Sequence, residues 1–67
     1  MPVHPDELRA IDNLIHEAQE RITDQRERLA ALERQGQDTT AAREILLVLE
    51  NSLSLLISRR NLLLRRD

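Results

Sequence analysis

Apolar side chains recur every three or four residues along two long stretches of this chain, and the only glycine, Gly36, lies between them. This spacing keeps one face of an α-helix apolar over many turns, as in coiled coils and helical bundles. The core positions of the first stretch are Leu8, Ile11, Ile15, Ala18, Ile22, Gln25, Leu29 and Leu32. Because Gln25 is the one polar member of this series, the first helix is expected to bury a single narrow stripe.

The segment around Gly36 predicts a tight turn. Glycine readily adopts the left-handed conformation that ends a helix, and either Asp38 or Thr39 can cap the next helix by accepting its free N–H groups. So short a connection forces the two helices to lie antiparallel, with the residue numbers of facing pairs adding up to about 75.

The start of the first helix is marked by Pro5, whose ring fixes φ near the helical value. Either His4 or Asp6 can occupy the cap position, so the start is defined to within two residues. We expect one domain over residues 1–67, consisting of a helix over 5–35, a turn at 36–38 and a helix over 39–65.

The second helix is apolar over a much wider arc than the first. At 100° per residue its apolar positions cover roughly 220° of the helix circumference. One partner helix cannot cover so wide an arc, and a domain of 67 residues offers little other core. We therefore predict an all-α, two-helix antiparallel hairpin that dimerises into a four-helix bundle.

The predicted dimer interface lies on the second helix, at Leu46, Leu49, Leu53, Leu56, Ile57, Leu63 and Leu64. Antiparallel pairing brings Gln25 level with Ser52, and these two residues are predicted to form a polar layer in the core. The pattern leaves open which flank of the second helix faces the partner, and whether that partner is a second copy or a different, unidentified protein.

Composition excludes several kinds of site. The chain has no cysteine for disulfides or thiolate metal sites, and no aromatic residue on which single-stranded nucleic acid could stack. It contains neither a paired nucleophile and base nor a glycine-rich phosphate loop, so we expect a non-enzymatic protein without cofactor or metal. Asp12, His16 and Glu20 share one helical row, and we interpret this row as a solvated polar face rather than as a set of metal ligands.

Four arginines gather near the C-terminus: Arg59, Arg60, Arg65 and Arg66. Such cations complement the negative end of a helix dipole, and Arg59 and Arg60 can reach Asp12 or Glu17 on the first helix or the carboxylates of a partner. Arginines in such a cluster can also bind anionic lipid or the phosphates of a nucleic acid. With a net charge of -2, the chain favours the structural role and disfavours membrane and nucleic-acid partners.

The segment from Gly36 through Asp38, Thr39 and Ala42 to Leu53, with the later Arg-Arg-Asn-Leu-Leu, resembles short uncharacterised bacterial helical-hairpin proteins. Their pattern is G-x-D-T-x-x-A-x-x-L-L-x-x-L-E-x-S-L, and the similarity covers residues 22–64. Position 45 carries Ile where that pattern has Leu, a conservative core exchange. The resemblance implies a helical hairpin and brings no catalytic residues with it.

These features together predict a protein-interaction or structural adaptor module that acts as a homodimeric helical bundle. The N-terminal residues lack the basic start and apolar run of a signal peptide, so we expect the cytoplasm as its location. The alternative is a membrane-surface or nucleic-acid-binding accessory protein that uses the C-terminal arginine cluster.

Overall fold

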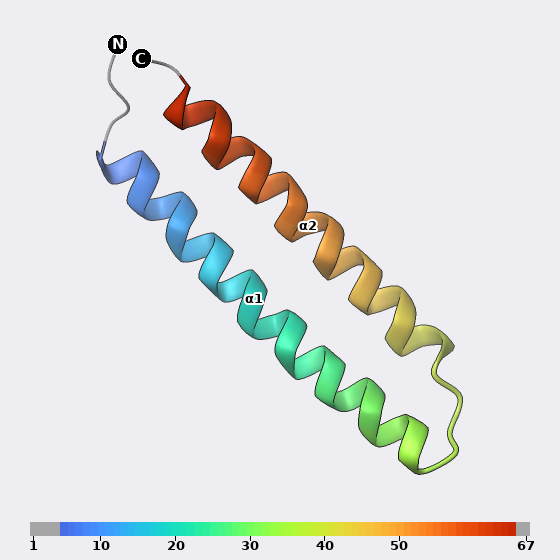
Figure 1. Ribbon diagram of the computed structural model, residues 1–67. Helices are drawn as coiled ribbons and strands as arrows, with labels where there is room; N and C mark the ends of the chain where they lie inside the picture. The colour runs from blue at the N-terminus through green and yellow to red at the C-terminus, as the bar shows by residue number, and fades with distance from the viewer. Residues whose placement is uncertain (1–4, 66–67) are drawn as a thin grey trace.

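Two antiparallel helices joined by a tight turn make up the computed structural model, which describes residues 5–65 (Figure 1). Helix α1 spans Pro5–Arg34 and helix α2 spans Thr40–Leu64. The four ends differ from the predicted bounds by at most one residue, and residues 5–65 contain no strand, so the all-α hairpin is confirmed. Of the two predicted cap residues, Asp6 lies within α1, and His4 lies outside the described residues.

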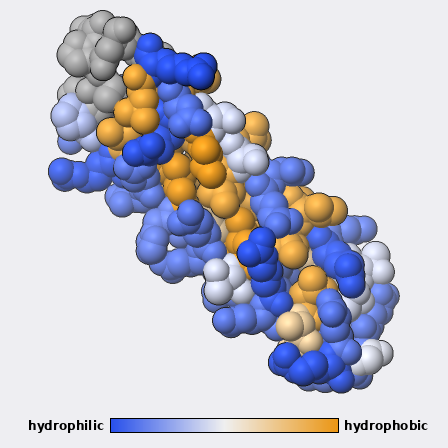
Figure 2. Space-filling model, viewed as in Figure 1, coloured by the Kyte–Doolittle hydropathy of each residue, from blue (hydrophilic) through white to orange (hydrophobic). Residues whose placement is uncertain are grey.

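The hairpin is a thin rod whose Cα atoms extend over 54 × 14 × 11 Å. A body that is one helix pair thick has no second layer to cover its interior, and only Ile11, Ile22 and Ala42 are buried within the described residues. Figure 2 shows hydrophobic side chains along the long axis of the rod, still visible from outside between hydrophilic neighbours. The hairpin therefore shields its own core incompletely.

The helices contact one another through a heptad series on each helix. All eight core positions predicted for α1 are buried or half-buried, as the repeat requires. The matching positions on α2, again spaced by three and four, are Ala42, Leu46, Leu49, Leu53, Leu56, Arg60 and Leu63. This series, which we call the seam, occupies only part of the apolar arc of α2.

The turn ends α1 in a Schellman motif. The N–H of Gln37 donates to the carbonyl of Leu32 at 3.0 Å, and the N–H of Gly36 donates to the carbonyl of Glu33 at 3.1 Å. Gly36 has a φ of 67°, the left-handed value that this motif needs. The predicted role of Gly36 is confirmed.

Asp38 supplies the polar group that begins α2. Its Oδ1 accepts hydrogen bonds from the backbone N–H of Thr40 at 3.0 Å and from the Thr40 hydroxyl at 2.8 Å. Those two bonds, the backbone one first, lower the pKa of the Asp38 carboxyl below its usual value. Thr39 makes no side-chain cap bond. Of the two predicted capping residues, Asp38 is therefore the one whose side chain accepts a free N–H of α2.

Replacing Gly36 with alanine is expected to destabilise the hairpin through its backbone alone. A Cβ at this position would meet nothing within 4 Å, but an L-residue at a φ of 67° costs about 1–2 kcal/mol. For a chain of this size the loss corresponds to a fall in Tm of roughly 4–8 °C per kcal/mol. Thermal unfolding followed by circular dichroism should show Gly36→Asn, which tolerates this conformation better, between the wild type and Gly36→Ala. An unchanged Tm for Gly36→Ala would contradict the turn geometry.

Candidate interaction surface

Ion pairs between α1 and α2 bridge the two helices along one side of the hairpin. Among residues 5–65, the pairs that cross from helix to helix include Arg60 Nε to Asp12 Oδ1 at 2.6 Å, Arg26 Nη2 to Glu50 Oε2 at 3.1 Å, and Arg43 Nη2 to Glu33 Oε1 at 3.5 Å. At 100° per residue, five of these six residues lie on the same side of the seam, and Arg60 belongs to the seam itself. Their numbers add up to about the predicted 75, so the predicted register is confirmed.

These pairs agree with the register but add little to the stability of the fold. All six side chains remain more than a third exposed, so solvent and salt screen the attraction between them. Arg60 is also a seam position, and its pairing with Asp12 confirms the predicted structural role for one of the C-terminal arginines.

The other side of α2 presents a second heptad series, which we call the outer stripe. It runs Ile45, Val48, Ser52, Leu55, Arg59 and Leu62, and it lies roughly a quarter of a turn from the seam. Its four aliphatic side chains are 51–72% exposed, with Leu55 the most exposed of them. The outer stripe is therefore an apolar face that α1 does not cover.

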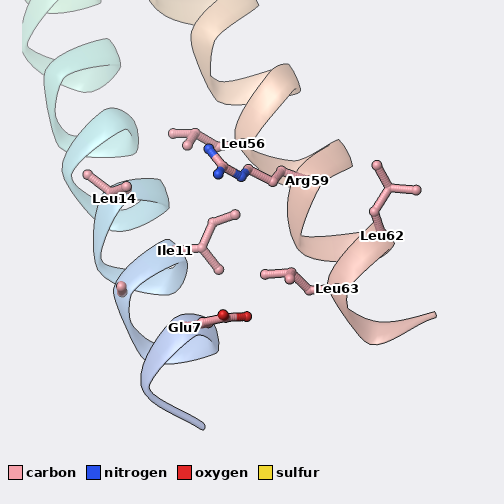
Figure 3. A pocket seen from close by; sticks show the side chains of 8 residues that line it. Glu7, Ile11, Leu14, Leu56, Arg59, Leu62 and Leu63 are labelled. Carbon is pink, nitrogen blue, oxygen red and sulfur yellow. The ribbon is translucent and has the colours of Figure 1, made fainter. Parts of the chain in front are cut away.

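A groove of about 620 Å³ opens on this side, at the end of the hairpin where α1 begins and α2 ends (Figure 3). It is lined by Glu7, Ala10, Ile11, Leu14, Leu56, Arg59, Leu62 and Leu63. Ile11 and Leu63 point toward one another between the helices, whereas Leu62 points away from α1 and Arg59 extends from α2 toward α1. Leu14 is 50% exposed, so α1 adds apolar area to the same side.

The residues predicted for a dimer interface fall on two different parts of α2. Five of them are half-buried members of the seam and pack on α1: Leu46, Leu49, Leu53, Leu56 and Leu63. The other two, Ile57 and Leu64, are exposed at the edge of the seam that faces away from the outer stripe. The outer stripe lies within the predicted apolar arc but outside the predicted interface. Its signal in the sequence is the seven-residue spacing of Val48, Leu55 and Leu62.

The structure does not bring Gln25 and Ser52 together. The Gln25 side chain is half-buried in the seam, and its Nε2 donates to the backbone carbonyl of Ala42 at 2.9 Å. Ser52 is exposed on the outer stripe, turned away from α1. The Gln25 amide reaches a backbone carbonyl of α2 that lies nearer the turn. It is therefore hydrogen-bonded without a second polar side chain.

Asp12, His16 and Glu20 are divided between two different contacts. His16 Nε2 lies 2.7 Å from Glu20 Oε1 on the surface of α1, while Asp12 pairs with Arg60 on α2. Over residues 5–65 no group of three or more side chains of the metal-ligating types comes together.

Among the C-terminal arginines, Arg59 and Arg65 are exposed and have no ion pair with any described residue. Arg66 lies outside the described part of the chain. Neither α1 nor α2 is long and apolar enough to cross a membrane. Comparison of the chain with protein-family models, with curated proteins and with solved structures gave no match.

Substituting Gln25 by leucine is expected to raise Tm, because the seam then gains apolar burial in place of one amide bond worth about 0.5–1.5 kcal/mol net. The same substitution should also loosen the register, since a polar seam residue restricts how helices pair. Thermal unfolding and size-exclusion chromatography measure the two effects. Gln19→Leu, on an exposed part of α1, is the matched control and should change neither. An unchanged Tm and a single species for Gln25→Leu would contradict this role.

Proposed function

We propose that this protein is a non-enzymatic interaction module that works as a homodimer, with two hairpins joined through the outer stripes of α2 into a four-helix bundle. The single observation that carries the proposal is the exposure of that stripe, from 51% at Ile45 to 72% at Leu55. A regular apolar series of this length, uncovered by its own chain, is the usual mark of a helix that packs on another helix.

The available burial is large enough to drive association. Burying the exposed part of each aliphatic side chain of the stripe contributes about 1–2 kcal/mol, so eight such side chains in a two-fold dimer contribute roughly 8–16 kcal/mol. Association itself costs about 4–15 kcal/mol in lost translational and rotational freedom. Because the two ranges overlap, we expect a dimer that exchanges with its monomer rather than a permanent assembly.

A dimer formed in this way leaves the outer face of α1 in contact with solvent. That face carries acidic and basic side chains in alternation, for example Glu17, Arg21, Asp24 and Arg28, all of them exposed. We propose that this charged surface is what the module presents to a second protein, as an adaptor in the cytoplasm. The dimer supplies two copies of it on one rigid body.

The alternative, a lipid- or nucleic-acid-binding role for the C-terminal arginines, has less support. Arg60 is already paired with Asp12, which leaves Arg59 and Arg65 as the unpaired cations among the described residues of the cluster. Sequence-independent binding to phosphates needs several contacts to compete with physiological salt. Two unpaired arginines next to an acidic α1 offer few such contacts.

Leu55→Ser is expected to dissociate the dimer, because Leu55 lies mid-stripe and becomes buried only in the assembly. Sedimentation equilibrium at micromolar concentration should show the wild type as two chains and the variant shifted toward one. Leu47→Ser is the matched control: Leu47 is 60% exposed on α2 but lies off both the seam and the outer stripe, so its loss should leave the mass unchanged. Equal behaviour of the two variants would count against the outer stripe as the interface.

A further inference from the structure

The sequence of the outer stripe is self-complementary when one copy runs antiparallel to the other. With a two-fold axis between Ser52 and Leu55, Ile45 of one copy lies opposite the partner's Leu62, and Ser52 lies opposite the partner's Leu55. In heptad terms, each a position of one copy then faces a d position of the other copy, as antiparallel helix pairs require. Each large side chain at the centre is matched by a small one.

The third layer of this pairing places Arg59 opposite the partner's Val48. Arg59 is exposed and has no ion pair with a described residue, and it is one of the residues that line the groove, as is Leu62. An arginine stem can cover apolar surface while its guanidinium stays in water. The same arrangement carries the partner's Ile45 to Leu62, at the edge of the groove that contains Leu14.

A row of polar residues beside the outer stripe has the same symmetry. This flanking row consists of Glu44, Asn51, Ser58 and Arg65, at a spacing of seven residues. Its two charged members stand at opposite ends, and each is exposed without an ion pair among residues 5–65. Antiparallel pairing sets Glu44 against the partner's Arg65 twice, and Asn51 against the partner's Ser58 twice.

A parallel pair gives no such match. The positions that would then face the flanking row are Leu49, Leu56 and Leu63, which are half-buried in the seam and carry no charge. Glu44 and Arg65 would have no opposite charge to meet on the other copy, and the two Arg59 side chains would lie side by side, which like charges oppose.

We propose, resting on the homodimer proposed above, that the occupant of the outer stripe is a second copy of this chain with α2 antiparallel to α2. The two-fold axis passes between Ser52 and Leu55, and Glu44 of each copy pairs with the partner's Arg65. This arrangement joins the two hairpins through α2 and leaves both α1 helices on the outside.

Single cysteines test the orientation directly, because the natural chain has none. Chains carrying Ile45→Cys and chains carrying Leu62→Cys are purified separately, mixed, and treated with a short thiol-specific cross-linker. The mixture should give cross-linked dimers, whereas each variant alone should not, since like positions at residue 45 would lie about 25 Å apart. Leu47→Cys mixed with Leu62→Cys is the matched control and should react poorly.

The cross-linking outcomes separate this inference from the proposed function. Dimers by sedimentation that cross-link each variant to itself, or that cross-link in neither experiment, would overturn the antiparallel arrangement and leave the homodimer standing. A single-chain mass at every concentration would overturn the homodimer and the arrangement together.

Charge reversal tests the flanking row. Glu44→Arg should raise the dimer dissociation constant about 10-fold at low salt, because two attractive pairs become repulsive ones. Combining Glu44→Arg with Arg65→Glu should return the constant to within about threefold of wild type. Glu27→Arg, on the exposed face of α1, is the matched control and should have no effect. Failure of the double variant to recover would overturn the Glu44–Arg65 pairing.

Discussion

Two helices packed side by side can each bury only one stripe, and the rest of this structure follows from that limit. The seam of α1 fills its own narrow stripe, but α2 is apolar well beyond its seam. The hairpin therefore buries only Ile11, Ile22 and Ala42 among its described residues. The folding free energy of one copy comes from a seam of mostly half-buried side chains, which is a weak basis for a stable domain of this size.

Charge gives the hairpin two unlike sides. The three cross-helix ion pairs among the described residues agree with the register and, apart from the seam residue Arg60, lie on one side of the seam; Asp12 with Arg60 is the shortest pair. The outer stripe and the groove occupy the other side, where Glu44, Arg59 and Arg65 have no ion pair within residues 5–65. The side with the outer stripe and the unpaired charges is the one that the proposed homodimer would use.

Local signals in the sequence are enough to predict the helices and the turn. Gly36 and Asp38 act where glycine and a capping carboxylate are expected to act, and the heptad series of α1 is all buried or half-buried. The rotation of α2 about its own axis could not be predicted in the same way. Its apolar arc contains two adjoining heptad series, and only the packing against α1 decides which of them, Leu46 to Leu63 or Ile45 to Leu62, becomes the seam.

Whether the exposed face of α2 is covered by a second copy can be read from the dependence of thermal stability on protein concentration. If folding is coupled to dimerisation through the outer stripe, Tm should rise by several degrees between about 1 and 100 µM protein, because association stabilises the folded state by mass action. A Tm that stays constant over this range, together with a well-folded single chain by sedimentation, would contradict the dimer.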